Sequence, residues 1–336
     1  MKRFLLASVF AVAAASGAMA QTPTPGPKAI NTGGPAGAYH GTFCPPLPAV
    51  LANAYFQGYQ CTPSAGTVQN IQRVFAQPTN IGFAQLDVFA REAAQRPAEF
   101  ERLAVVRSDI ACEGLWMVTR NPDLDFGRVL GLARRIQFVL PAQASGSTAS
   151  FNYLRSIDPD GLGRVPDSNI TYLQDATAVI RRIAESNQGE VGFFVQFADP
   201  RNANIRLMVE SGVRVIPVIS REILRARVGE QNVYQAQTFQ LAGGNLFGIG
   251  GRAVTATTAC TPVALFTGAP SAFSDRNGQD DAREMIDRLR SIPTAALMPQ
   301  DNTVQSILRN ATRLSQSAVD RAVEGVEAAK RAVESR

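Results

Sequence analysis

The chain of 336 residues is ordinary for one large or two medium globular domains, since 45% of its residues are hydrophobic and 18% are charged. Lys and Arg number 33 and Asp and Glu 28, a formal net charge of +5, and two of the cations, Lys2 and Arg3, lie in the first 20 residues. The remaining +3 is mild and evenly scattered, so the composition argues against a nucleic-acid partner.

The first 20 residues have the features of a secretory signal peptide. Lys2 and Arg3 precede an apolar run that extends to Ala15, and Ala18-Met19-Ala20 forms a small-x-small cleavage pattern before Gln21. A membrane span needs about 20 apolar residues, and neither this run nor any later stretch is long enough. We therefore predict a cleaved signal peptide and a mature protein that lies outside the cytoplasm and is not inserted in the membrane.

After the Thr- and Pro-rich residues 21–27, which we expect to form a flexible leader, short apolar runs alternate with amphipathic segments. The first series comprises an extended run at 28–31, helices at 46–55, 67–76 and 87–94, and strands at 56–62, 81–85, 103–106 and 114–119. A second series follows at 136–141, 149–157, 170–173, 176–186, 191–195, 205–210 and 213–217, and strand-like segments return at 237–241 and 253–266. This alternation is typical of α/β folds with largely parallel sheets.

The two series predict two α/β lobes with a cleft between them. We place lobe 1 at 28–120 and 236–275, lobe 2 at 121–235, and a helical C-terminal extension at 276–336. Within the extension we expect a helix at 280–292, a linker at 293–302 and one long helix at 303–335. The long helix carries a narrow, Ala-rich apolar stripe, which suits docking on the back of the protein or on a partner helix.

Four cysteines in an exported chain indicate two disulfides rather than a metal site. None lies in a CxxC pattern, and the sequence has a single histidine, His40. Cys44 and Cys61 flank the first predicted helix, so a bridge between them would close a loop of about 15 to 20 residues. By elimination Cys112 pairs with Cys260, which would place those two regions in one domain.

Three loops rich in glycine and hydroxyl residues each join a predicted strand to a predicted helix. They cover 32–39, 62–70 and 144–149, and Gln85-Leu86-Asp87 forms a fourth junction of this kind. Glycine lets the backbone approach a bound group, and helix N-termini offer unpaired N–H groups to an anion. Turn formation and helix capping explain each loop taken alone. Their coincidence at the carboxyl ends of strands, where open α/β sheets bind ligands, predicts a shared site.

Four of these motifs resemble, in order, those of TAXI-type solute-binding proteins, the extracytoplasmic receptors of a class of TRAP transporters. They are Thr32-Gly33-Gly34-x-x-Gly37-x-Tyr39, Ser64-Ala65-Gly66-Thr67-Val68-Gln69-Asn70, Ile81-Gly82-Phe83-Ala84-Gln85-Leu86-Asp87 and Gly146-Ser147-Thr148. The resemblance covers Lys28 to Phe266, with departures from the family pattern at 63–67 and at His40. It implies the type II periplasmic-binding-protein fold, in which two α/β lobes joined by two crossovers close on a small ligand.

The resemblance also implies which residues line the cleft. They are Gly34, Gly37, Tyr39, Ser64, Gly66, Thr67, Asn70, Gln85 and Asp87 from lobe 1, and Ser145, Gly146, Ser147 and Thr148 from lobe 2. These donors suit an anionic group and Asp87 suits an ammonium, so a small carboxylate or amino acid is the expected ligand. Gln196, at the end of a strand, is a further candidate. Arg73, Arg107 and Arg120 are candidate forks for a carboxylate, although most arginines lie on the surface.

We therefore predict a solute-binding protein that delivers its ligand to membrane transporter subunits, with no cofactor, no metal and no enzymatic activity. A Ser-His-Asp site would have to use His40, a His-rich metal site cannot form, and GxSxG is absent. Between Lys28 and Lys330 there is no lysine for a phosphate loop or a Schiff base. Two alternatives stay open, a ligand-sensing or scaffold protein that binds a protein partner, and an exported hydrolase.

Overall fold

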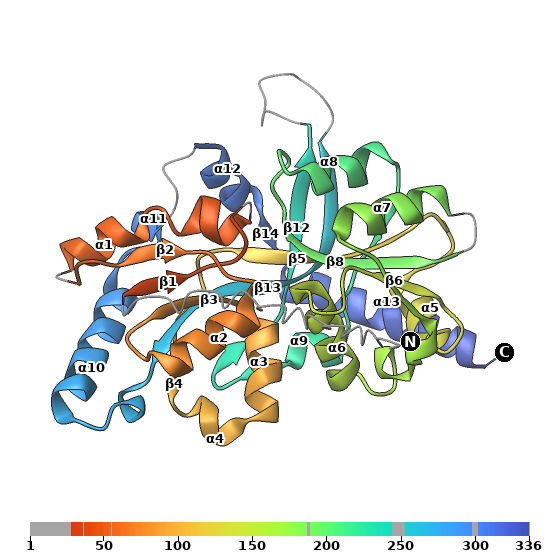
Figure 1. Ribbon diagram of the computed structural model, residues 1–336. Coiled ribbons are helices and arrows are strands. Elements are labelled where there is room, and N and C mark those ends of the chain that lie inside the picture. Colours follow the sequence, from red (N-terminus) through yellow and green to blue (C-terminus); the bar gives the residue numbers. More distant parts are fainter. Residues whose placement is uncertain are drawn as a thin grey trace, which may run out of the picture.

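The computed structural model describes residues 28–35, 37–54, 56–186, 189–243, 253–297 and 302–335. The predicted signal peptide and leader lie outside these residues. Figure 1 shows two groups of strands and helices, on the left and right of the view, joined by the long central strand β13 (Val254–Gly268). We call the left group lobe 1 and the right group lobe 2.

Lobe 1 is built on strands in the order β2-β1-β3-β13, with β4 also paired to β13. Its strands are β1 (Ala29–Asn31), β2 (Gln60–Thr62), β3 (Ile81–Gln85) and β4 (Leu103–Arg107). Its helices are a π-helix (Tyr39–Phe43), α1 (Leu47–Asn53), α2 (Thr67–Ala76), α3 (Leu86–Gln95) and α4 (Pro97–Phe100). β1 is parallel to β2 and β3, whereas β13 is antiparallel to β3 and β4. The sheet is therefore mixed rather than largely parallel, because β13 enters it from the other lobe.

Alternation along β3 sends successive side chains to opposite faces of the sheet. Phe83 packs in one apolar cluster with Phe43, and Ala84 packs in another with Ile71 and Val74 of α2. Helices cover both faces, so every residue of β3 is buried. The carboxyl end of this strand is thereby held rigidly where the predicted site begins.

Lobe 2 continues the sheet in the order β13-β5-β8-β6-β7, with β9 paired to β5 and β12 to β13. Its strands are β5 (Cys112–Thr119), β6 (Phe138–Leu140), β7 (Ile170–Tyr172), β8 (Val191–Phe197), β9 (Arg214–Ile216) and β12 (Gln235–Ala242), and β10 (Arg227–Val228) and β11 (Gln231–Asn232) form a small hairpin. Its helices are α5 (Phe126–Gly131), α6 (Gly146–Ile157), α7 (Ala176–Glu185), α8 (Ala203–Glu210) and α9 (Arg221–Arg225), and short 3-10 turns lie at Leu162–Arg164, Asp167–Asn169 and, after β13, Pro270–Ala272. Apolar clusters again lie on both faces.

The pairing along β13 shows where the chain passes between the lobes. Residues 254–260 pair with β12 and residues 260–262 with β5, whereas residues 263–268 pair with β3 and β4. Because β5 also pairs with β8, we propose a first crossover near 108–111 rather than at 120. Two crossovers between two α/β lobes give the architecture of periplasmic binding proteins, so the predicted fold class is confirmed.

The C-terminal extension differs from the prediction. It contains α10 (Arg276–Ser291), α11 (Thr294–Leu297), α12 (Asn302–Asn310), β14 (Thr312–Arg313) and α13 (Gln316–Glu334). One long helix at 303–335 is wrong, because the chain extends at β14 to pair with β12, and the Leu314 N–H donates to the Ala236 carbonyl at 3.1 Å. Ser315 then accepts from the Ala318 N–H at 3.4 Å and begins α13.

Two glycines of α5 allow α13 to pack closely against it. A Cβ added to Gly127 would lie 2.3 Å from the Val326 carbonyl oxygen and 2.6 Å from the Ala329 Cβ. A Cβ added to Gly131 would lie 2.8 Å from the Val333 Cβ. The last helix of the extension, α13, therefore docks on lobe 2 with its apolar stripe facing α5.

We expect Gly127→Ala to lower the free energy of unfolding by about 1–3 kcal/mol, because the added methyl group overpacks this contact. Gly325→Ala on α13 is the matched control, since no atom lies within 4 Å of the Cβ it adds. That change should be neutral or stabilise by up to about 1 kcal/mol through helix propensity. Urea denaturation of the two variants measures both effects, and wild-type stability in Gly127→Ala would contradict the docking of α13.

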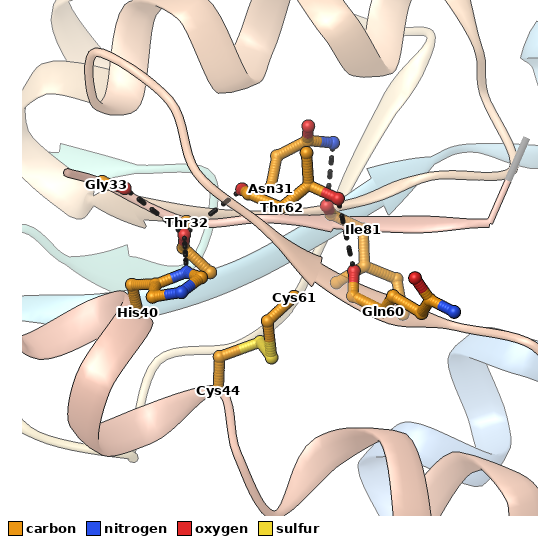
Figure 2. The surroundings of a disulfide bond; sticks show 9 residues. All are labelled: Asn31, Thr32, Gly33, His40, Cys44, Gln60, Cys61, Thr62 and Ile81. Atoms are coloured by element: carbon orange, nitrogen blue, oxygen red, sulfur yellow. Dashed lines mark hydrogen bonds between the residues drawn. A yellow bond between two sulfur atoms is a disulfide. The ribbon is translucent and has the colours of Figure 1, made fainter. Parts of the chain in front are cut away.

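The predicted linker at 293–302 is also wrong, because α11 forms within it, whereas most other predicted elements are met with small shifts. Both predicted disulfides are present, Cys44–Cys61 beside β2 (Figure 2) and Cys112–Cys260 between β5 and β13. The strand expected at 56–62 is shortened to β2, because Gly58 has φ of +86°, which breaks the extended backbone. Among the described residues, no helix is long and apolar enough to span a membrane.

Candidate functional site

Three helix N-termini meet at Gln85, the last residue of β3 and the N-cap of α3. Its backbone N–H donates to the Thr67 hydroxyl, at the start of α2, at 3.0 Å. A Cβ added to Gly146, the first residue of α6, would lie 2.3 Å from Gln85 Oε1, so a larger residue there would displace the end of the Gln85 side chain. Because α2 and α3 belong to lobe 1 and α6 to lobe 2, Gln85 lies at the contact between lobes. We call Gln85 and the buried polar groups around it, Tyr39, Asp87, Glu113 and Tyr234, the interlobe seam.

A buried carboxyl group, Glu113, lies in the seam on β5. The Tyr39 hydroxyl donates to Glu113 Oε2 at 2.7 Å, and the Tyr39 ring stacks on Phe83 at 5.4 Å between centroids. Burial raises the pKa of Glu113 to about 7, although its hydrogen bonds to Tyr39 and Gln85 lower it. Burial also holds the pKa of Tyr39 well above its usual value, so Tyr39 stays a donor. Glu113 is thus balanced between its charged and neutral forms near neutral pH.

A second buried carboxyl group, Asp87, lies in the first turn of α3. It accepts from the Val88 N–H at 2.7 Å and from the Tyr234 hydroxyl at 3.1 Å. Its own backbone N–H donates to the Thr261 hydroxyl of β13 at 3.1 Å. Burial raises the pKa of Asp87 to about 6, because the desolvated charge is only partly compensated by these donors. The N-terminus of α3 also favours its negative charge.

The predicted residues of the first two loops form a hydrogen-bonded frame behind Gln85. The Ser64 hydroxyl donates to the Thr32 carbonyl at 2.7 Å, and Asn70 Nδ2 donates to the same carbonyl and to that of Phe83, at 2.8 Å from the latter. Ser64 Oγ accepts from the Gly66 N–H at 3.0 Å. Ser64 and Asn70 therefore hold the backbone at the carboxyl ends of β1 and β3. Of the glycines in the first loop, Gly34 and Gly37 are exposed and form a turn, with Gly37 N–H donating to Gly34 O at 2.8 Å.

The predicted residues of lobe 2 cap and anchor α6. Ser145 accepts from the Thr148 N–H at 3.2 Å, and the buried Thr148 hydroxyl donates to the Pro141 carbonyl at 3.1 Å. Ser147 Oγ accepts from the Val195 N–H of β8 at 2.9 Å. The Gln196 carbonyl accepts from Trp116 Nε1 at 2.9 Å, and its side chain reaches Asn204 at 3.5 Å. Gly146 is the member of this group that contacts the seam.

The candidate arginine forks have structural partners instead. Arg107 pairs with Asp109 at 2.6 Å and with carbonyls of the C-terminal extension. Arg73 donates to the Pro63 carbonyl at 2.8 Å, and Arg120 to the Ala184 carbonyl at 3.0 Å. Figure 2 shows that His40 Nδ1 faces the Thr32 hydroxyl, 3.0 Å away, beside the Cys44–Cys61 bridge.

The structure thus brings Tyr39, Thr67, Gln85, Asp87 and Gly146 together and leaves the other predicted residues in supporting positions. Sequence reasoning missed two seam residues, Glu113 and Tyr234. For Glu113 a signal was present, because it is a single acid within an otherwise apolar stretch, 110–118. Tyr234 gave no comparable signal, since its contact with Asp87 spans 147 residues of sequence.

Three cavities among the described residues have volumes of about 270, 590 and 490 Å³. The first lies between β12 and α12, the second between α9 and α13, and the third between α3 and α6. The hollow that the sequence predicts among the loops is not one of these three, because the seam groups bond directly to one another. In the described parts of the chain, no three His, Cys, Asp or Glu side chains gather as metal ligands would.

Comparisons with known proteins give only remote structural likenesses. No family model matches it, and no curated protein matches it. Similar solved structures include the BvgS VFT2 domain of Bordetella pertussis, with 11% identity, a TM-score of 0.42 and coverage of 83% of this chain and 92% of that one. PhnD1 of Prochlorococcus marinus, solved with methylphosphonate, has 10% identity, a TM-score of 0.45 and coverage of 89% and 97%. The GluR0 ligand-binding core, solved with L-glutamate, has 14% identity, a TM-score of 0.41 and coverage of 83% and 96%. At these values the likeness is remote and no functional conclusion follows from it.

Proposed function

We propose that the protein is a periplasmic solute-binding protein that captures a small anionic or zwitterionic metabolite between its lobes and delivers it to a TRAP-type transporter. The meeting of helix N-termini at Gln85 carries this proposal. Each helix N-terminus acts as roughly half a positive charge, so three of them meeting at one residue favour a carboxylate. The resemblance to TAXI-type receptors supplies the transporter class.

The two buried carboxyl groups favour a ligand that also carries an ammonium. Glu113 and Asp87 have raised pKa values because burial penalises their charge. A cation placed between them would compensate that penalty and lower both pKa values. An amino acid, with its carboxylate at the helix N-termini and its ammonium at Glu113, satisfies both features. The seam groups now bond to one another, so the ligand would enter as the lobes separate.

Ligand titration followed by thermal unfolding tests the proposal. We expect at least one member of a panel of amino acids, dicarboxylates and keto acids to raise the melting temperature, since a ligand at 100 times its Kd stabilises by about 2.7 kcal/mol. A folded protein whose melting temperature no member moves would count against solute binding. Calorimetry then gives the affinity for the active compound.

Variants at the seam connect that binding to Gln85. We expect Gln85→Leu to weaken binding of the active compound at least about tenfold, because a hydrogen bond to a charged group contributes about 1.5–3 kcal/mol. Gln57→Leu is the control, because Gln57 is exposed and precedes β2, the strand at the edge of the sheet. Equal loss in both variants would show that Gln85 does not contact the ligand.

The two alternatives have less support. For a scaffold protein, the extension would have to present α13 to a partner, but its stripe already packs on α5. For a hydrolase, His40 would have to serve as the base, but it faces the Thr32 hydroxyl, which itself bonds backbone carbonyls. The hydrolase hypothesis would regain support if the wild type turned over a substrate and His40→Ala abolished that turnover.

A further inference from the structure

The cavity of about 490 Å³ between α3 and α6 lies on the flank of the contact between the lobes. We call it the flank groove. Its polar lining residues are Arg91, Gln95, Asn152, Tyr153, Arg155 and Ser156. The first two come from lobe 1 and the others from lobe 2, and α3 packs against α6 beneath them. Of the described lining residues, none is acidic, so the groove presents hydrogen-bond donors and two guanidinium groups from opposite lobes.

The acids nearest to these arginines leave cationic character in the groove. Glu92 contacts Arg91 at 3.1 Å but also Arg96 at 3.0 Å, so one carboxylate serves two guanidinium groups. Arg155 pairs with Asp167 at 2.8 Å, and the Asp167 side chain is 85% exposed, which lets solvent screen the pair. Neither carboxylate lines the groove.

Arg155 also has a donor that the described residues do not satisfy. Its Nη2 donates to the Val165 carbonyl at 2.7 Å and its Nη1 to Asp167, whereas its buried Nε has no acceptor. An unpaired buried N–H costs about 1–3 kcal/mol, so such groups normally have a bound water or ion as partner. An acceptor in the flank groove would remove that cost.

Tyr153 separates the flank groove from the seam. Its buried ring lies 6.2 Å from that of Tyr234, which bonds Asp87. Burial and the nearby Asp87 charge raise the pKa of Tyr153 to about 12, so its hydroxyl remains a proton donor at neutral pH. The flank groove is therefore a site apart from Gln85 and does not depend on the proposed solute site.

We propose that the flank groove binds a small divalent oxyanion, such as a phosphate, between Arg91 of lobe 1 and Arg155 of lobe 2. Guanidinium groups bind such oxyanions through paired N–H donors. Because the two arginines lie on different lobes, the anion links α3 to α6. Its binding therefore favours the arrangement in which the lobes are in contact.

Isothermal calorimetry of the full chain with inorganic phosphate at low ionic strength tests this site. We expect saturable binding of one phosphate, weakened at least tenfold in Arg91→Gln and in Arg155→Gln. Arg206→Gln on α8, an exposed arginine outside the groove, should bind as wild type does. Arg155→Gln also loses the hydrogen bonds of Arg155 to Val165 and Asp167, so it could fail to fold. In that case the result for Arg91→Gln alone tests the proposal.

Gln85→Leu separates the two sites. Phosphate binding that survives Gln85→Leu and is lost in Arg91→Gln supports the flank groove. Binding lost in Gln85→Leu and kept in Arg91→Gln would overturn it and place the anion in the seam. Absence of saturable phosphate binding by the wild type, or equal affinity in wild type and Arg91→Gln, would also overturn it, whatever the solute panel shows.

Discussion

Replacing both Cys112 and Cys260 by alanine is expected to lower the free energy of unfolding by roughly 5 kcal/mol in the chain-entropy model. The bridge joins residues 148 apart in sequence, so its loss frees a very long loop in the unfolded chain. It also fixes β5 to β13 at the point where β13 passes from lobe 2 to lobe 1. Urea denaturation of the purified variant, against the oxidised wild type, measures the change.

The other disulfide is the internal control for this prediction. Cys44 and Cys61 are 17 apart, so the same model gives roughly 3 kcal/mol for the Cys44→Ala, Cys61→Ala variant. The order of the two losses matters more than their size, because packing and strain also contribute. A smaller loss for Cys112 and Cys260 than for Cys44 and Cys61 would contradict the expectation.

Stability is expected to fall as the pH rises from about 4.5 to 7, through the two buried carboxyl groups of the seam. The folded-state pKa values, about 7 for Glu113 and about 6 for Asp87, lie above the ordinary values of 4.5 and 3.8. Between these limits the folded protein holds protons that the unfolded chain has released, so unfolding releases protons and rising pH favours it. At roughly 1.4 kcal/mol per pKa unit, the two groups together change the free energy of unfolding by several kcal/mol.

Glu113→Gln isolates one of the two groups. The amide cannot ionise but still offers an oxygen to the Tyr39 hydroxyl, so we expect a flatter stability profile between pH 5 and 7.5. Glu101→Gln, at an exposed position after α4, is the control and should leave the slope unchanged. Urea midpoints at the two pH values provide the measurement, and an unchanged slope in Glu113→Gln would show that Glu113 ionises normally in the folded protein.

The periodicity of hydrophobic residues was sufficient to predict most helices and strands of the fold. α2 and β3 begin and end at the predicted residues, because an amphipathic stripe and a buried run each determine one element. The same periodicity explains why the prediction of one helix at 303–335 was wrong. The apolar stripe continues through β14, so the sequence pattern does not reveal that the helix is interrupted there. Edge pairing of β14 with β12 is a long-range contact, and local periodicity carries no information about it.

The candidate site was predictable where the residues lie at strand ends. Gln85 ends β3, Asp87 lies in the first turn of α3 and Gly146 begins α6, so their positions follow from local pattern. Glu113 and Tyr234 depend instead on which distant strands share a sheet, and strand order was not readable from the sequence. Their contribution changes the expected chemistry, because Glu113 adds a second buried carboxyl group beside the predicted Asp87 and Tyr234 adds a hydroxyl that donates to Asp87.

The two ends of the C-terminal extension pack on different lobes. The apolar side chains Val304 and Ile307 of α12 pack with the α10 residue Leu289 in a cluster that also holds Phe83 of β3, whereas α13 rests on α5 in the other half of the molecule (Figure 1). The lobe separation proposed above would therefore change the distance between fluorophores on exposed positions of α10 and α13. Energy transfer between them would report that separation in real time, without any label near the interlobe seam.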